Sequence, residues 1–310
     1  MLNLPSICKQ NYSEFEVIIV DDHSDDESIS IIKHLQQEFK HLKLVFATDY
    51  GLKGKRNALL TGVKHAKYDH LLFTDADCRP ASTNWIFKMT EPLEGGADIV
   101  AGISPIRKDS VFLNKWARWD NFNVYWQYSS FIAYGLAYMA TGRNMAMKRS
   151  TFFRTIQNPK YNSTLTGDDD LLVNSYNNSS KISMVNHPAS FTFTNYPSTC
   201  KAWFNQKSRH VGSARYYRLL PGFLLALFQF SWLIVYIFLI LLLIFGVNTK
   251  LVLLIFVGRL LFLSTVLSRP LSRTQNQDLI KWIPLFDGIT VIINLILIPF
   301  LWFDKKKKWR

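Results

Sequence analysis

The sequence predicts an α/β domain with a mostly parallel sheet flanked by helices, followed by C-terminal membrane helices. Three observations support this prediction. Short apolar runs alternate with helical patterns in the first half of the chain, as expected where helices cover both faces of a parallel sheet. Acidic residues cluster before residue 171. Most of the apolar excess follows residue 218, where one run is long enough to cross a bilayer.

Composition limits the classes of partner. The 310 residues leave room for one large domain or two, and they carry 36 Lys and Arg against 23 Asp and Glu, a formal charge of +13. Such an excess favours nucleic acid, an anionic membrane surface or phosphorylated substrates. We expect no nucleic acid, because the cations lie near the apolar segments and acidic motifs would repel a phosphodiester backbone. Three widely spaced cysteines favour a reducing compartment.

The first strand of the sheet is expected over residues 15–22, an apolar run that ends in Asp21 and Asp22. Ser24 or Asp25 can cap the amphipathic helix that follows it. The acids would then lie at the carboxyl end of a strand, where open α/β sheets bind their ligands.

A basic loop follows the second strand, which is expected over residues 42–47. Residues 51–57 hold two glycines and three cations, Lys55 among them, ahead of a helix over 58–67. A loose glycine-containing turn with cations at the start of a helix suits a phosphate group. A solvated basic loop would have the same pattern.

The central strand is expected over residues 70–74 and leads into Asp75 and Asp77. If the strand continues through them, both carboxylates point the same way. Two carboxylates on one side repel each other unless a proton or cation joins them, and a hard divalent ion suits such a pair. The alternative is an acidic turn with no bound ion.

The chain continues with a strand over 97–102 and an aromatic-rich stretch over 111–138, which we expect to be helical. Core packing is the favoured role of these rings, and an acceptor-binding or bilayer-facing surface is the alternative. Residues 141–149 form a loop that enters a short strand. Residues 168–170 then place three acids beside an apolar pair, which requires a cation, a catalytic role or a helix N-terminus.

Three apolar segments end the chain. Residues 219–245 carry no charge, the shorter segment 251–267 contains Arg259, and 283–303 carries Asp287. We expect the first to span a membrane. A buried core helix pair is an alternative for the other two.

Charge predicts the orientation of these segments. Arg269, Arg273 and Lys281 lie between the last two segments, and residues 305–310 form a basic tail. The positive-inside rule places both regions in the cytoplasm, which three simple spans cannot achieve. We therefore expect the last segment to be interfacial or re-entrant.

Six sequence motifs occur one after another over residues 5–215. They are VIIVDDHSDDES, GLKGKRNAL, FTDADCRP, TGRNMAMKRS, TGDDD and QKSRH. Together they resemble a family 2 glycosyltransferase of the GT-A fold, of the inverting, membrane-attached kind. The resemblance implies a Rossmann-like domain over 1–215, a membrane region of two to three helices over 216–304 and a basic tail over 305–310. Relatives begin with a further strand, which this chain is expected to lack.

The resemblance also implies roles for single residues. Asp22 corresponds to the acid that contacts the nucleoside, and Asp75 and Asp77 to the pair that holds the donor and its Mg²⁺ or Mn²⁺. Asp169 corresponds to the catalytic base, with Asp168 as the alternative if the register slips by one. Lys55 would neutralise charge on the departing diphosphate.

A last motif concerns the donor side of the site. Gln206, Arg209 and His210 lie at i, i+3 and i+4, on one face of a helix. They resemble the Q-x-x-R-W motif of processive and lipid-acting members, with histidine in place of tryptophan. That exchange removes a large stacking surface.

The implied function is transfer of a sugar from a nucleotide-sugar donor, UDP-linked by default, to a hydroxyl of a lipid or glycan acceptor with inversion. The implied place is the inner or cytoplasmic membrane, where the protein would be multi-pass with its catalytic domain facing the cytoplasm. The alternative is a catalytically impaired relative that binds nucleotide sugar or acts as a scaffold in a membrane glycan-synthesis complex.

Overall fold

The computed structural model describes residues 3–52, 55–162, 167–176, 178 and 181–301. They fall into two compact units, each described by itself below. The first unit comprises the described residues of Met1–Arg107 and Gln127–Asn195, and the second those of Lys108–Trp126 and Tyr196–Phe303. The predicted basic tail and Thr166 lie outside the described residues. The predicted domain limits stay a prediction.

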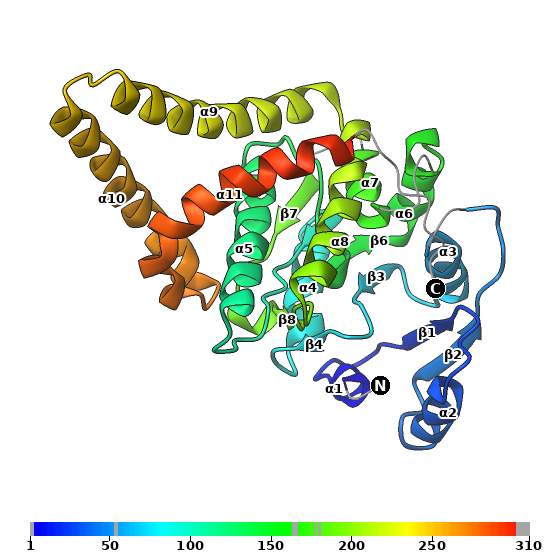
Figure 1. Ribbon diagram of the computed structural model, residues 1–310. Helices are drawn as coiled ribbons and strands as arrows, with labels where there is room; N and C mark the ends of the chain where they lie inside the picture. The colour runs from blue at the N-terminus through cyan, green and yellow to red at the C-terminus, as the bar shows by residue number, and fades with distance from the viewer. Residues whose placement is uncertain (1–2, 53–54, 163–166, 177, 179–180, 302–310) are drawn as a thin grey trace. The chain divides into compact units, whose positions relative to one another are not determined.

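The first unit begins with a parallel strand pair (Figure 1). Strands β1 (Val17–Asp21) and β2 (Leu42–Phe46) pair in register from Val17 opposite Leu42 to Asp21 opposite Phe46. Helix α2 (Ser28–Glu38) buries Ile32 against this pair, and α1 (Leu4–Cys8) and α3 (Arg56–His65) complete this part of the unit. Neither Ser24 nor Asp25 caps α2, because the helix begins after both residues, at Ser28. The Ser28 N–H donates instead to Asp26 Oδ1 at 2.9 Å.

A four-stranded sheet forms the centre of the first unit. Its order is β3 (His70–Phe73), β6 (Met145–Lys148), β5 (Ile99–Ala101) and β7 (Ile182–Met184). Strand β6 is antiparallel to both of its neighbours, whereas β5 and β7 are parallel. Strands β3, β5 and β7 thus share one direction, as predicted for β3 and β5, and the chain enters β6 from the opposite end.

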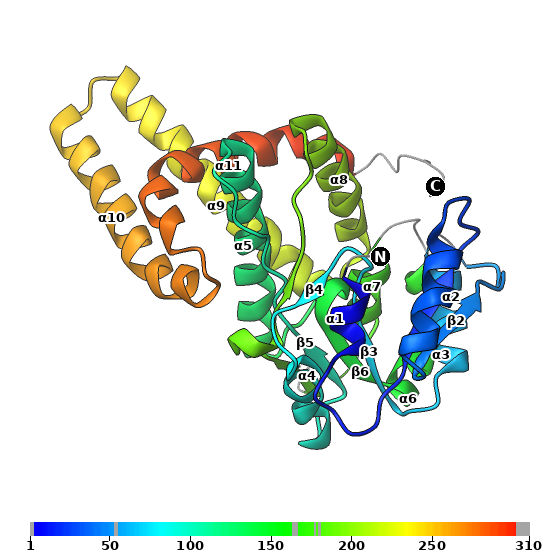
Figure 2. The same ribbon diagram turned by 90° about the horizontal axis from the view of Figure 1, so that it is seen from below.

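A helix and a short strand pair complete this part of the first unit. Helix α4 (Trp85–Glu94) packs Trp85, Ile86, Met89 and Leu93 against Val100 and Ala146 of the sheet. Each fully buried apolar side chain of this size stabilises the fold by about 1.5–3 kcal/mol. The short strands β4 (Arg79–Pro80) and β8 (Thr192–Phe193) form an antiparallel pair, and α1 lies beside β4 (Figure 2).

The aromatic-rich stretch forms helix α5 (Phe112–Ala133), as predicted, and its residues up to Trp126 belong to the second unit. Core packing is confirmed for many of its rings, since Trp119 and Phe122 are 0% and 1% exposed. The remaining elements of the first unit are the 3-10 helices η1 (Gly142–Asn144), η2 (Pro159–Asn162) and η4 (Pro188–Ser190), and the helices α6 (Arg149–Ile156) and α7 (Asp168–Asn174).

The second unit is helical. It contains α8 (Cys200–Val211), η5 (Gly212–Tyr216), α9 (Leu219–Ile244), α10 (Thr249–Arg273), η6 (Gln277–Trp282), α11 (Ile283–Leu297) and η7 (Ile298–Leu301). Three segments are long and apolar enough to cross a membrane, judged by length and composition: Leu219–Ile244, Thr249–Arg273 and Gln277–Leu301. Helix α10 is longer than predicted and continues through Pro270 to Arg273. Leu254 and Phe262 on α10 are 69% and 72% exposed, which argues against a buried core helix pair.

Arg259 of α10 and Asp287 of α11 form an ion pair. Arg259 Nη1 lies 2.6 Å from Asp287 Oδ2, and Nη2 lies 3.3 Å from Oδ1. Trp232 Nε1 and Tyr236 Oη each donate to the same carboxylate at 2.7 Å. Asp287 is fully buried. Four donors from α9 and α10 therefore hold one acid of α11, so the second unit accommodates this charge within its three helices.

Candidate active site

A lysine between acids marks the candidate site of the first unit. Lys55 immediately precedes α3, and its Nζ lies 3.2 Å from Asp75 Oδ1 and 3.1 Å from Asp168 Oδ2. Asp75 follows β3, and Asp168 begins α7. The fold thus brings together three segments that are far apart in the sequence, at the carboxyl end of β3. The sequence predicted this strand to be central, and that expectation is wrong, because β3 lies at the edge of the four-stranded sheet.

Electrostatics in this cluster favour added positive charge. Burial by itself lowers the pKa of Lys55, but the carboxylates of Asp168, Asp75 and Asp169 outweigh it and hold that pKa above its ordinary value. Burial raises the pKa of Asp168, and the charge of Asp169 adds to this while Lys55 opposes it. Lys55 and Asp168 both hold their protons more firmly than usual, as expected where negative charge is in surplus.

A second cation lies close to the cluster. Arg56 is fully buried, its guanidinium carbon lies 5.0 Å from the centre of the Tyr161 ring, and its charge lowers the pKa of Asp168. Among the described residues, the carboxylates of Asp75, Asp168 and Asp169 thus act on Lys55, with Arg56 as a second cation close by. The cluster can accept a further cation at its open side, where Asp75 is 40% exposed.

Asp169 is held by the backbone at the start of α7. Its Oδ2 accepts from the Gly142 N–H at 2.7 Å, and its Oδ1 accepts from the Asp170 N–H at 3.0 Å. A Cβ added at Gly142 would lie only 3.0 Å from the Asp169 Cβ, so glycine is what permits this approach. Hydrogen bonds to the charged form of a carboxylate keep it ionised. The sequence signal for Gly142 is the TGRN motif, to which the sequence analysis assigned no role.

The acids Asp75 and Asp77 do not continue the strand, and that expectation is wrong. Strand β3 ends at Phe73, and the Cys78 N–H donates to the Asp75 carbonyl at 3.0 Å, which closes a turn. Asp77 Oδ2 accepts instead from Thr194 Oγ1 at 2.9 Å. The sequence gives no sign of this role for Thr194, because a single threonine after a short strand forms no recognisable pattern.

The fit of this turn to a divalent cation can be tested on its donors. Among the described residues, no three His, Cys, Asp or Glu side chains converge as a preformed metal cage. Asp75 and Asp77 supply two carboxylates, and Mg²⁺ is commonly held by one or two carboxylates together with substrate phosphates. The donor set fits a metal that arrives with a diphosphate.

Among the described residues, Asp22 pairs with its neighbour His23 and makes no hydrogen bond or ion pair with the acidic cluster. It follows β1 and is exposed, with its Oδ1 3.4 Å from His23 Nδ1. No hydrogen bond or ion pair joins it to Lys55 in the part of the chain that the structure describes. Its neighbour Asp21 is buried and accepts from the Ser24 N–H at 3.4 Å, so of the two acids Asp22 is the one available to a ligand.

Gln206, Arg209 and His210 lie on α8 of the second unit, and the predicted helix is confirmed. Thr199 caps α8 by accepting from the Ala202 N–H at 3.1 Å. Since these three residues and the acidic cluster belong to different units, the predicted role of the three at the donor stays a prediction.

Residues 3–153 match the family model for Glycosyl transferase family 2. The chain carries a family 2 glycosyltransferase domain. The GT-A-like α/β fold predicted from the sequence, with its three C-terminal apolar helices, is confirmed along with it. The acidic cluster around Lys55 draws two of its segments, the loop before α3 and the turn after β3, from this glycosyltransferase domain.

Sequence relatives of the glycosyltransferase domain cover parts of the chain. The Uncharacterized glycosyltransferase YibD of Escherichia coli (strain K12) is 29% identical over 31% of this chain and 27% of that protein. An Undecaprenyl-phosphate 4-deoxy-4-formamido-L-arabinose transferase of Edwardsiella ictaluri is 26% identical over 45% of this chain and 38% of that protein. The chain spans well under two thirds of the length of either relative.

A solved structure is similar in outline. The structure of S. aureus TarS 1-349 in complex with UDP-GlcNAc has a TM-score of 0.43 and 14% identity, over 71% of this chain and 63% of that chain.

Proposed function

We propose that this protein transfers a sugar from a nucleotide-sugar donor, UDP-linked, to a hydroxyl of a lipid or glycan acceptor, with inversion at the anomeric carbon. The observation that carries the proposal is Lys55 held between Asp75 and Asp168, beside an Asp169 fixed by Gly142, in a chain with a family 2 glycosyltransferase domain.

The turn after β3 and the residues around it would bind the donor. Asp22 would contact the nucleoside, and Asp75 and Asp77 would hold Mg²⁺ or Mn²⁺ with the diphosphate. The metal would stabilise negative charge on the leaving diphosphate. The Lys55 ammonium adds positive charge on the same side, where preorganised donors stabilise a developing anion most effectively. Gln206, Arg209 and His210 would complete the donor side from α8.

Asp169 would activate the acceptor hydroxyl. Its two backbone hydrogen bonds favour the ionised form, and an ionised carboxylate can take the proton of an attacking hydroxyl that lies within about 3 Å. Asp168, the alternative base, is buried and already ion-paired with Lys55. This difference supports Asp169 as the base and Asp168 as the partner of Lys55.

The acceptor and the location follow from the second unit. Three helices suited to cross a membrane support a membrane-bound acceptor, and the name of the Edwardsiella relative includes undecaprenyl phosphate. Arg269 and Arg273, by the positive-inside rule, support a cytoplasmic location for the end of α10. The catalytic domain would face the cytoplasm from a multi-pass anchor in the cytoplasmic membrane, and the interfacial or re-entrant placement of the last segment remains part of the proposal.

The test is a donor panel. Membranes that contain the full chain would be incubated with a series of UDP-sugars, Mg²⁺ or Mn²⁺ and lipid extract, and released UDP would be measured. One donor should give UDP release that depends on the acceptor. Donor binding without release from any donor would contradict the proposal and favour the impaired relative or scaffold instead.

A further inference from the structure

The last turn of α10 carries a cationic pocket. Its lining is Ser268, Arg269, Ser272 and Arg273, around a shallow depression that is largely open to solvent. The two serines and the two arginines each repeat at i, i+4, so the four side chains share one side of the helix. Both arginines are exposed. The pocket therefore presents two guanidinium groups and the Ser272 hydroxyl to a ligand, whereas Ser268 Oγ donates to the Thr265 carbonyl at 2.7 Å.

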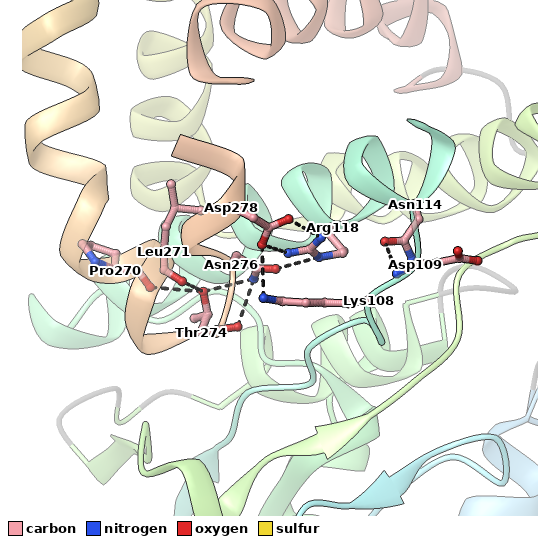
Figure 3. Close-up of polar contacts among 9 residues, drawn as sticks. All are labelled: Lys108, Asp109, Asn114, Arg118, Pro270, Leu271, Thr274, Asn276 and Asp278. Carbon is pink, nitrogen blue, oxygen red and sulfur yellow. Dashed lines mark hydrogen bonds and ion pairs between the residues drawn. The ribbon is translucent and has the colours of Figure 1, made fainter. Parts of the chain in front are cut away.

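The acid nearest in sequence does not neutralise these arginines (Figure 3). Asp278 is bound by Arg118, whose Nη1 and Nη2 donate to its two oxygens at 2.8 Å and 2.5 Å. Lys108 Nζ adds a third contact at 3.2 Å. Within the described part of the chain, no carboxylate lies within 4.0 Å of Arg269 or Arg273. The pocket keeps its positive charge.

The end of the helix is also rigidly held. Thr274 Oγ1 donates to the carbonyls of Pro270 and Leu271, each at 3.1 Å, and the Asn276 N–H donates to Leu271 at 2.7 Å. Asn276 Oδ1 accepts in turn from Arg118 Nε of α5 at 2.9 Å. Figure 3 shows these contacts as one continuous network. A fixed helix end reduces the entropy lost when a ligand binds.

The position of the pocket indicates the source of its ligand. The apolar stretch of α10 ends at Leu267, and Phe262 before it is 72% exposed. In a bilayer the four polar side chains would lie where hydrocarbon gives way to headgroups. Arginine forks and hydroxyls match the oxygens of a phosphate group. We propose that this pocket binds the phosphate group of an anionic membrane lipid.

A simpler role makes a different prediction. Two arginines at a helix C-terminus also interact well with the helix dipole and with an anionic surface as a whole. In that case any two cations at the membrane surface would support lipid binding equally well, and binding would not depend on the last turn of α10. A specific pocket requires the guanidinium groups at these two positions.

The experiment uses the full chain in dodecyl maltoside micelles and a fluorescent phosphatidylglycerol as the probe, with binding followed by anisotropy. Arg269→Gln with Arg273→Gln should weaken binding by about tenfold or more, because two charge-assisted contacts are lost. Lys33→Gln with Lys250→Gln removes the same charge at exposed positions elsewhere and should change binding by about twofold at most. Fluorescent phosphatidylcholine should bind weakly to all variants.

Three results would overturn the proposal. One is equal binding by the wild type and the arginine variant, and another is an equal loss in the lysine variant. The third is displacement of the lipid by inorganic phosphate at concentrations similar to the lipid's own, which would make this a site for free anions. If the arginine variant aggregates, Arg269→Lys with Arg273→Lys and, separately, Ser272→Ala decide the matter. Each variant must weaken binding several-fold while gel filtration stays unchanged.

Discussion

Two ion-pair clusters, one in each unit, differ in their charge balance. Lys55 lies between acids that outnumber the nearby cations, and Asp75 at its edge is 40% exposed. Arg259 and Asp287 pair one to one, and Asp287 is 0% exposed with both of its oxygens accepting hydrogen bonds. The first cluster has unused capacity for a cationic ligand, whereas the second has none.

This difference separates a ligand site from a structural contact. A buried pair whose lone pairs are all satisfied holds its helices together, and removal of one partner leaves a costly charge. An acidic cluster with surplus charge close to solvent is stabilised when a metal or a cationic group arrives. Mutations in the first cluster should therefore change activity more than stability, and mutations in the second should do the reverse.

The largest effect is expected for Asp169→Asn. Loss of a general base costs about 10²–10⁴-fold in turnover, while UDP binding and thermal stability should stay close to wild type. UDP release and UDP binding measured on the same preparation check this. Asp69→Asn, at an exposed position of the same unit, is the matched control. Wild-type turnover in Asp169→Asn would exclude this residue as the base.

The reverse pattern is expected for Asp287→Ala. The change leaves Arg259 without its partner and should destabilise the second unit by roughly 3–5 kcal/mol. Thermal unfolding in detergent measures this. Replacing both partners, with Arg259→Met and Asp287→Leu, should recover most of the loss, because no lone charge remains. If Asp287→Ala is as stable as wild type, the ion pair does not hold the three helices together.

A smaller effect is expected for Gly142→Ala. The added Cβ would press on Asp169 and shift its carboxylate without removing it. Displacement of a catalytic group by about 1 Å can cost on the order of 10²-fold, so turnover should fall by that amount or less. The kcat should drop with little change in UDP affinity. An equal loss of both would indicate general disruption of the site instead.

The smallest effect is expected for Asp98 of the first unit, which lies near the two cations Lys148 and Arg154. Its carboxylate accepts from Tyr176 Oη at 2.5 Å and from Lys148 Nζ at 2.9 Å. Burial raises its pKa, but these two donors outweigh burial and hold the pKa below the ordinary value of 3.8. A lowered pKa means that Asp98 stabilises the fold above pH 3.8, and that this stability is lost as pH falls through the folded-state pKa.

Asn does not titrate, so Asp98→Asn isolates this contribution. The stability difference between wild type and variant should be about 1–2 kcal/mol at pH 6 and should shrink below pH 3.8. Thermal unfolding of both proteins from pH 6 to pH 3 measures it. A difference that does not change with pH would show that the Asp98 charge contributes nothing.

Short-range patterns by themselves determined much of this protein. Apolar runs located strands such as β1 and β3 to within a few residues, because short apolar runs favour strands. Burial on both faces, which such unbroken runs predict, is not observed, since most residues of both strands are only half-buried. Uninterrupted apolarity likewise located α9 as a candidate span. The sequence also showed that acids follow the strands, since their order along the chain is directly visible.

Only the tertiary structure decided which groups meet. It placed Lys55 between Asp75 and Asp168, turned Asp77 toward Thr194, and brought the Gly142 backbone to Asp169. The sequence showed Asp287 in an apolar segment without indicating its partner, and packing supplied Arg259. Periodicity is a local property of the chain. The pairing of charges depends on which distant segments pack together, and no local pattern contains that information.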